Sequence, residues 1–331
     1  MKRIIGTACI LTLIISAGLL PARGQQDGLT IYSGRSESLV EPLVESFREH
    51  TGIPVQVRYG GTSELAVLIT EEGERSPADI FWAQDAGGLG AVSRAGLLRE
   101  LPESLWPEVP GLFRSDSAFW IATSGRARLY AYSPQRTTDE QLPESVFDFT
   151  HPRYRSRVGW APTNGSFQAF VTGLRLAHGD EAALAWLEEM AAQDVQAYRN
   201  NTSLIEAVAA GEIDFALVNN YYLGRFTSVD PDFPVAQEFF TPGDIGNMVN
   251  TAGAGILTSS SSYQQALEFI RFLLSPEAQK FIVDELGEFP VVSLDNEGSY
   301  EELIHRSPDI DLDGLADLEG TLVIMRQAGL L

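Results

Sequence analysis

Residues 29–96 alternate between short apolar runs and amphipathic segments, in a strand–helix order that occurs three times. Strands are expected at 29–32, 54–59 and 79–82. Helices are expected around 39–47, 65–69 and 89–95. This order predicts an α/β fold, with a parallel sheet that has helices on both faces. The ligands of such sheets bind beyond the carboxyl ends of the strands, which here are 34–37, 59–63 and 83–85.

The second half of the chain repeats this pattern. A strand at 158–161 precedes a turn at 163–166, and a strand at 214–218 runs directly into Asn219-Asn220-Tyr221-Tyr222. Two further stretches, 122–132 and 248–257, are expected to be strands that cross between two lobes and form a hinge. The predicted lobes are residues 27–123 with 252–300, and residues 124–251 with 301–331.

Residues 1–24 have the three parts of a secretory signal peptide. Lys2 and Arg3 precede an apolar run that ends at Leu20, and Ala22-Arg23-Gly24 resembles a small-residue cleavage site. The run is short for a membrane span, which needs about 20 apolar residues, and a retained anchor is the alternative. We therefore expect a periplasmic or extracellular protein. The single cysteine lies in this segment, so the mature chain would have neither a disulfide nor a thiolate metal site.

The chain is strongly acidic, with 45 acidic and 23 basic residues and a net charge of −22. Residues 1–24 contain three basic residues and no acidic one, so 20 basic residues remain without them and the net charge becomes −25. Such a surface repels nucleic acid and anionic lipid, and we expect neither as a partner. The sequence has no P-loop, G-x-S-x-G elbow, dinucleotide-binding fingerprint or H-E-x-x-H motif, so these motifs give no support to an enzyme, and we expect none.

Tyr221 and Tyr222 follow a predicted strand and form the most distinctive polar pair of the chain. A phenol with a pKa of about 10 is protonated at neutral pH, but a bound, highly charged cation stabilises the phenolate. Hard oxygen anions suit hard cations such as Fe(III). The backbone turns beyond the end of a strand, so both rings can converge on one ion. Most tyrosines only pack and donate one hydrogen bond, so the rest of the chain must decide.

Several stretches of the chain carry a resemblance to a known family. They are Ile31-Tyr32-Ser33-Gly34, Glu72-Gly73 with Ser76-Pro77-Ala78-Asp79-Ile80-Phe81, Arg94-Ala95-Gly96-Leu97-Leu98, Thr123-Ser124-Gly125-Arg126, Val158-Gly159-Trp160-Ala161-Pro162-Thr163-Asn164-Gly165-Ser166-Phe167 and Val218-Asn219-Asn220-Tyr221-Tyr222. Over nearly the whole mature sequence, the chain resembles the ferric-iron-binding periplasmic solute-binding proteins, also called bacterial transferrins. The resemblance implies a two-lobe periplasmic-binding-protein fold of the type II kind, with Fe(III) bound between the lobes. It also implies delivery of the iron to an inner-membrane ABC transporter permease. We expect a monomer.

By this resemblance, Tyr221 and Tyr222 are iron ligands on the second lobe. Some members of the family add a His and a Glu from the first lobe, but this chain has Ser36 and Gln84 at those positions. Other members have a His-Tyr pair where this chain has Ser36-Glu37. The first-lobe ligands therefore stay open. The candidates are Tyr59, as a third phenolate, and Glu37, Gln84 and Asp85.

The family often completes the coordination of iron with a small anion, carbonate or phosphate. Asn164-Gly165-Ser166 opens a predicted helix, where it is either an anion site or an ordinary cap. Arg35 and Arg126 are expected to bind carbonate through bidentate hydrogen bonds, or else to pair with nearby carboxylates. Asn201 and Asn219 correspond to phosphate-contacting positions of the family.

Two other functions remain open from the sequence. The same fold could bind another small solute, such as an oxyanion, a polyamine or a thiamine-like compound. A hydrolase on a similar scaffold would require a nucleophile–base pair in the cleft.

Overall fold

The computed structural model describes residues 28–105, 109–294 and 298–331, so the expected signal peptide lies outside the described residues. The strands are β1 (Leu29–Ser33), β2 (Val55–Tyr59), β3 (Ile80–Ala83), β4 (Ile121–Tyr132), β5 (Val158–Trp160), β6 (Gln196–Ala197), β7 (Phe215–Asn219), β8 (Ala236–Glu238) and β9 (Val249–Ile256). The helices are α1 (Glu37–Thr51), α2 (Thr62–Glu72), α3 (Ala86–Arg94), α4 (Gly165–His178), α5 (Asp180–Ala192), α6 (Asn201–Ala210), α7 (Tyr221–Thr227), α8 (Tyr263–Leu273), α9 (Pro276–Leu286), α10 (Gly298–Arg306) and α11 (Leu318–Gln327). The α/β fold expected from the alternating pattern is confirmed.

The strands form a continuous order, β2-β1-β3-β9-β4-β7-β5-β6, and β8 pairs with β4 beside this path. β1 is parallel to β2 and β3, and β5 is parallel to β6 and β7. β9 is antiparallel to both β3 and β4. The two parallel groups are therefore joined through antiparallel strands in the middle.

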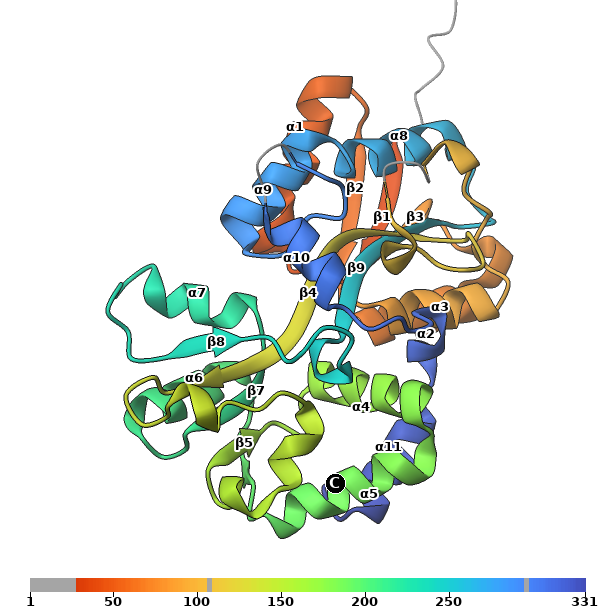
Figure 1. The fold of residues 1–331 in the computed structure, drawn as a ribbon. Helices are drawn as coiled ribbons and strands as arrows, with labels where there is room; N and C mark the ends of the chain where they lie inside the picture. The colour runs from red at the N-terminus through yellow and green to blue at the C-terminus, as the bar shows by residue number, and fades with distance from the viewer. Residues whose placement is uncertain (1–27, 106–108, 295–297) are drawn as a thin grey trace, which may run out of the picture.

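β4 and β9 run from one group of strands to the other, as Figure 1 shows in yellow and teal. The first part of β4 pairs with β9, and its last residues, Arg128 to Tyr132, pair with β7. These two strands occupy the stretches that the sequence predicted as crossings between lobes. In Figure 1, β1, β2, β3, α1 and α8 lie above them, and β5, β7, α4 and α5 lie below.

Capping residues explain several helix boundaries. Gly52 and Gly211 end α1 and α6 in the left-handed conformation, which glycine adopts without a steric penalty. Ser275 accepts a hydrogen bond from the Ala278 amide, with Pro276 as the first residue of α9. Asp85 and Asn164 cap α3 and α4 through their side chains. The last two caps also lie beside the candidate site.

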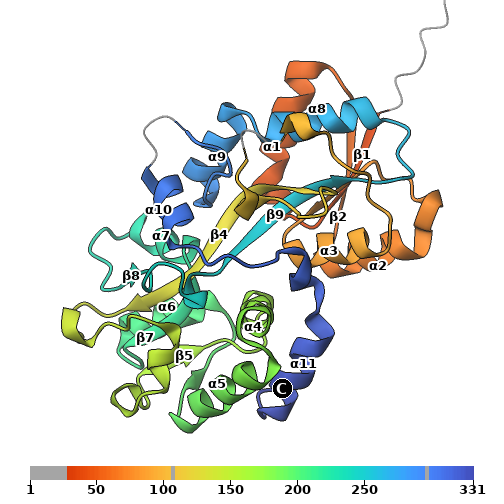
Figure 2. The same cartoon turned by 45° about the vertical axis from the view of Figure 1, so that its right-hand side comes forward.

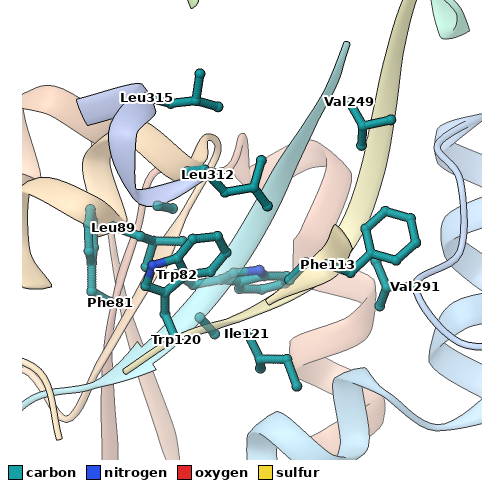
Figure 3. Packing of buried hydrophobic residues seen from close by; sticks show 14 of the residues in the cluster. Phe81, Trp82, Leu89, Phe113, Trp120, Ile121, Val249, Val291, Leu312 and Leu315 are labelled. Atoms are coloured by element: carbon teal, nitrogen blue, oxygen red, sulfur yellow. The ribbon is translucent and has the colours of Figure 1, made fainter. Parts of the chain in front are cut away.

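Large aromatic side chains fill the core on both sides of the crossing strands. Figure 3 shows Trp82, Trp120 and Phe113 packed against β4 and β9 with Leu89 and Ile121. The indole N–H of Trp82 donates to the Thr123 hydroxyl at 3.0 Å, which satisfies its polar atom inside this core. On the other side, the core rings include Trp160, Phe167, Phe170 and Trp186.

The C-terminal segment contacts both parts of the molecule. A 3-10 helix, η8 (Asp313–Ala316), packs against α3, and the Asp313 carboxylate accepts a hydrogen bond from the Trp120 indole at 2.6 Å. α11 then packs against α4 and α5, where the Thr321 and Thr172 hydroxyls lie 2.7 Å apart. Figure 2 shows this blue segment running from α10 past α3 to α11. Among the described residues, no helix is both long and apolar enough to cross a lipid bilayer.

Candidate functional site

The rings of Tyr221 and Tyr222 stack on each other, with centroids 4.5 Å apart and an interplanar angle of 29°. β7 ends at Asn219, and the two tyrosines begin α7. Successive side chains point to opposite faces of a strand but turn by only about 100° on a helix. The end of the strand just before the pair therefore lets both rings lie on one side, as the sequence predicted.

The tyrosine pair lies between two cavities. The first cavity has a volume of about 400 Å³, and the second has a volume of about 530 Å³. Tyr221, Tyr222 and Gln84 line both of them. The polar residues around the first cavity come from segments on both sides of the crossing strands: Gln84, Asp85, Arg126, Arg128, Asn164, Ser166, Gln168, Thr172, Asn219 and Asn250.

Arg126 and Arg128 are two buried cations on the wall of the first cavity, with exposed fractions of 7% and 3%. They lie two residues apart on β4, so both point to the same face of the strand. The guanidinium of Arg126 donates to the Gln84 carbonyl, and its Nε has no hydrogen-bond partner. Arg128 donates to the Leu217 carbonyl at 3.0 Å.

Neither arginine has an ion-pair partner within 4 Å among the described residues. Burial lowers the pKa of Arg128 to about 10, against the opposing effect of the two phenols. Arg128 therefore stays charged at neutral pH. It is held by the rings of Phe167 and Phe170, whose centroids lie 5.6 and 5.2 Å from its Cζ. The cavity wall thus carries two fixed positive charges with no carboxylate within ion-pair distance in the described part of the chain.

The N-terminus of α4 faces the same cavity. Asn164 accepts a hydrogen bond from the Ser166 amide at 3.0 Å, and Asn164, Gly165 and Ser166 all line the wall. Backbone N–H groups and the helix dipole favour an anion at such a position. The alternatives left by the sequence, a helix cap and an anion site, are compatible here because Asn164 caps α4 at the edge of the cavity.

Gln84 and Asp85 follow β3 and reach the cavity from the other side. The backbone N–H of Gln84 donates a hydrogen bond to the Thr62 hydroxyl at 3.0 Å, which stabilises the turn after β3. Asp85 accepts a hydrogen bond from the Gly88 amide at 2.9 Å and is half-buried. Asp85 is the only carboxylate among the described residues that line the first cavity.

Four predicted site residues lie elsewhere in the structure, beginning with Tyr59. The Tyr59 hydroxyl donates to Glu41 of α1, and burial together with that carboxylate raises its pKa far above the ordinary value of 10. Glu37 is exposed in the first turn of the same helix. Neither residue lines either cavity, because β2 and α1 hold them against each other at the edge of the sheet. The structure therefore does not bring them to the tyrosine pair.

Arg35 and Asn201 bind neighbouring residues and do not line the first cavity. Arg35 forms a buried ion pair with Glu288 at 3.0 Å, so its charge is already neutralised. Asn201 accepts a hydrogen bond from the Asn219 amide at 3.0 Å and is fully buried. It positions Asn219, which does line the first cavity. Of the seven expected anion-binding residues, the structure thus brings five to the first cavity: Asn164, Gly165, Ser166, Asn219 and Arg126.

Arg128 and Asn250 were missed by the sequence analysis. Arg128 shares a strand face with Arg126, and this two-residue alternation is a signal that could have revealed it. Asn250 accepts a hydrogen bond from the Ala86 amide at 3.3 Å, which links β9 to the start of α3. No motif marks Asn250, because only the pairing of β9 with β4 brings it to the cavity.

The phenol of Tyr222 needs a nearby cation in order to ionise. Burial and the neighbouring Tyr221 raise the pKa of Tyr222, although Arg225 and Arg126 act against this rise. The guanidinium of Arg225 lies over the two rings, 5.6 and 4.9 Å from their centroids. In the part of the chain that is described, no group of three or more His, Cys, Asp or Glu residues could hold a metal ion. Phenol oxygens are therefore the distinctive hard donors of this site.

Comparisons with known proteins show which families and structures the chain is similar to. Residues 75–309 match the family of bacterial extracellular solute-binding proteins. The major ferric iron-binding protein of Neisseria meningitidis serogroup B is 31% identical over 328 residues, which cover 96% of this chain and 97% of that protein. The Fe(3+)-binding periplasmic protein of Serratia marcescens is 32% identical over 274 residues, which cover 82% of this chain and 80% of that protein.

Solved structures show the same fold. Iron-bound HitA from Pseudomonas aeruginosa aligns with a TM-score of 0.80 and 32% identity, over 92% of this chain and 99% of that one. The Trichodesmium protein IdiA, or FutA, in complex with iron and citrate aligns with a TM-score of 0.81 and 27% identity, over 92% of this chain and all of that one. The predicted two-lobe α/β fold is confirmed by these similarities.

Proposed function

The chain belongs to the family of bacterial extracellular solute-binding proteins, and on this premise we propose that it binds ferric iron outside the cytoplasm and delivers it to an inner-membrane ABC transporter permease. Its relatives from Neisseria meningitidis and Serratia marcescens are named as ferric iron-binding proteins. The expected signal peptide at 1–24 supports a location in the periplasm or outside the cell. In this role the protein carries a cargo and catalyses no reaction.

The observation that carries the proposal is the stacked pair of Tyr221 and Tyr222 on the wall shared by both cavities. A trivalent cation lowers the pKa of a coordinated phenol and releases its proton. The adjacent rings place two hard oxygen donors on one ion, while a softer or singly charged solute would gain little from them. Gln84 and Asp85 are the first-lobe residues that could add oxygen donors, because they line the first cavity from the opposite side.

An anion would accompany the iron. Arg126, Arg128 and the N-terminus of α4 offer two positive charges and backbone N–H groups on the wall of the first cavity. The resemblance of the sequence implies carbonate or phosphate in this place, and Asn219 would add an amide donor. We propose that the lobes, with the boundaries 27–123 with 252–300 and 124–251 with 301–331, close over iron and anion together.

Oxyanion binding without iron is the second candidate function. It is favoured by Arg126 and Arg128, which line the first cavity and form no ion pair with any described carboxylate. A polyamine is disfavoured by the same observation, because two buried cations would repel it. The two candidates differ in one property. Only iron binding requires the phenol oxygens.

The test is an absorption titration of metal-free protein with ferric nitrilotriacetate in bicarbonate buffer. Phenolate coordination should produce a visible charge-transfer band. We expect Tyr221→Phe and Tyr222→Phe each to weaken iron binding at least about tenfold, and the double variant to lack the band. Tyr263→Phe is the matched control, because Tyr263 starts α8 and packs against Arg99 away from both cavities. A band that persists in the double variant would refute the proposal.

A further inference from the structure

Asn220 stands between the end of β7 and the start of α7, directly before Tyr221 and Tyr222. Its backbone already has helical angles, with φ at −53° and ψ at −44°. An asparagine at the start of a helix commonly caps it by accepting a hydrogen bond from one of the first amides. The Asn220 side chain makes no capping bond within the described residues of α7. Its amide group is used for contacts outside the helix.

One of these contacts extends the pairing of β7 with β4. The backbone N–H of Asn220 donates to the Ala127 carbonyl at 3.1 Å, and the Ala127 N–H donates to the Asn220 Oδ1 at 3.1 Å. In an antiparallel pair, a backbone carbonyl would accept the second of these bonds. Because the side-chain oxygen accepts it instead, the chain can turn into α7 while the buried Ala127 amide keeps its partner.

The nitrogen of the same side chain reaches the other lobe. Nδ2 of Asn220 donates to the Gly287 carbonyl at 3.2 Å. With the proposed boundaries, Asn220 belongs to the lobe 124–251 with 301–331, and Gly287 belongs to the lobe 27–123 with 252–300. A flipped amide would set two donors against each other at Ala127 and two acceptors at Gly287, so the hydrogen bonds fix its orientation. One side chain next to the tyrosine pair therefore connects both lobes.

The Gly287 carbonyl lies in a loop that is firmly held. Gly287 ends α9 in the left-handed conformation, with φ at 64°. The next residue, Glu288, forms the buried ion pair with Arg35 at 3.0 Å. Phe289 and Gly125 then exchange two backbone hydrogen bonds of 2.8 Å. The acceptor for Asn220 is therefore fixed in position.

These contacts form a closed ring beside the crossing strand β4. Loop 287–289 bonds to β4 at Gly125, Asn220 bonds to β4 at Ala127, and the bond from Asn220 to Gly287 completes the ring. Figure 1 shows α9 above α7 on the same side of β4. Bending of β4 as the lobes separate would pull Gly287 away from Asn220, whereas Ala127 stays in the same lobe as Asn220. The bond to Gly287 is thus the contact that lobe opening breaks.

We propose that Asn220 is a positioning residue that holds the tyrosine pair against the first lobe in the closed, iron-loaded form, an inference that rests on the proposed function. Asn220 is not among the described residues that line either cavity, so it acts through Tyr221 and Tyr222 rather than on the iron. Its bond to Gly287 slows the opening of the lobes and thereby the release of iron. Capture of iron by the open form does not depend on this bond.

The rates of iron release and capture test the inference. Protein loaded with ferric nitrilotriacetate in bicarbonate buffer is mixed with excess EDTA, and the loss of the charge-transfer band gives the release rate. The growth of the band in metal-free protein gives the capture rate. Asn220→Asp keeps an acceptor for the Ala127 amide but loses the donor to Gly287. We expect this variant to release iron at least about tenfold faster and to capture it within about twofold of the wild-type rate.

Two further variants complete the experiment. Asn220→Ala loses both side-chain bonds without adding a charge, and it should also release iron at least about tenfold faster. Asn200→Asp is the matched control, because Asn200 also directly precedes a helix but caps it, accepting from the Ser203 amide at 2.9 Å. This control should release iron at the wild-type rate. Circular dichroism of the metal-free variants reports on their folding.

The outcomes separate this inference from the proposed function. Release at the wild-type rate from both Asn220 variants would overturn the inference and leave iron binding intact. Equal changes in capture and release would also overturn it, because the residue would then act in the open form as well. If the wild type shows no band with ferric nitrilotriacetate, the proposed function itself fails, and the inference fails with it.

Discussion

Both carboxylate oxygens of Glu288 accept hydrogen bonds from one guanidinium nitrogen of Arg35, at 3.1 and 3.0 Å. The two side chains are only 5% and 2% exposed. The Ser124 hydroxyl donates to the same carboxylate, so this pair ties the loops after β1 and α9 to the crossing strand β4. The contact explains why Arg35 belongs to the scaffold rather than to the anion site.

Removal of the Glu288 charge should destabilise the fold. Glu288→Gln leaves the buried Arg35 without its counter-ion, and such a loss typically costs about 3–5 kcal/mol of unfolding free energy. Urea denaturation at pH 7 measures the change. Glu206→Gln, an exposed position on α6, is the matched control and should change the unfolding free energy by less than about 0.5 kcal/mol.

The same pair predicts a pH dependence of stability. Burial alone would raise the pKa of Glu288, but Arg35, Arg126 and the hydrogen bond from Ser124 outweigh it and lower the pKa below its ordinary value of 4.5. The carboxylate therefore stabilises the folded state above pH 4.5, and this contribution is lost as the pH falls through the lower, folded-state pKa. Urea titrations between pH 7 and pH 3 should show a steeper loss for the wild type than for Glu288→Gln. Parallel curves would contradict this assignment.

Tyr59→Phe should leave iron binding unchanged within about twofold. The Tyr59 hydroxyl is engaged by Glu41, and its raised pKa opposes ionisation. The charge-transfer band and the iron affinity of this variant are compared with those of Tyr221→Phe. Loss of the band in Tyr59→Phe would mean that this phenol is a third ligand after all.

Asn164→Asp should separate the two roles of the α4 N-terminus. Aspartate caps a helix about as well as asparagine, so the unfolding free energy should stay within about 0.5 kcal/mol. Its negative charge, however, lies beside the place of the anion and should weaken iron-dependent anion binding at least about tenfold. Asn200→Asp makes the same change at the cap of α6, outside both cavities, and should bind normally. Equal binding by the two variants would argue against an anion at α4.

Asp313→Ala should loosen the C-terminal segment. Asp313 accepts hydrogen bonds from the fully buried Trp120 indole at 2.6 Å and from the Ser115 hydroxyl at 2.8 Å. A buried donor left without an acceptor typically costs about 1–3 kcal/mol. Urea unfolding followed by tryptophan fluorescence measures this loss, with the exposed Asp309→Ala as the control. Unchanged stability would show that the segment is held by its apolar contacts alone.

Local features of the fold could be predicted well because they depend on neighbouring residues. The strands β1, β2 and β3 appear within two residues of their expected positions, since apolar runs bounded by polar segments define them. Gly52 and Gly211 end helices because only the backbone at that residue decides the conformation. The Tyr221-Tyr222 pair was likewise expected at the cavity, because it directly follows the end of a strand.

The first-lobe side of the site could not be predicted in the same way. Tyr59 is the last residue of a strand and Gln84 directly follows one, but β2 lies at the edge of the sheet and β3 lies beside the crossing strand β9. Arg35 and Arg126 look alike in the sequence. Glu288, 253 residues along the chain from Arg35, neutralises only the former through an ion pair.

The sequence alone therefore determined the alternation of strands and helices, the two crossing strands and the neighbouring phenols, because each depends on residues that are close in the chain. The tertiary structure decided which charges are left unpaired at the cavity. Charge compensation depends on distances of a few ångströms between segments that are far apart in the sequence, and only the pairing of β4 with β7 and β9 sets those distances.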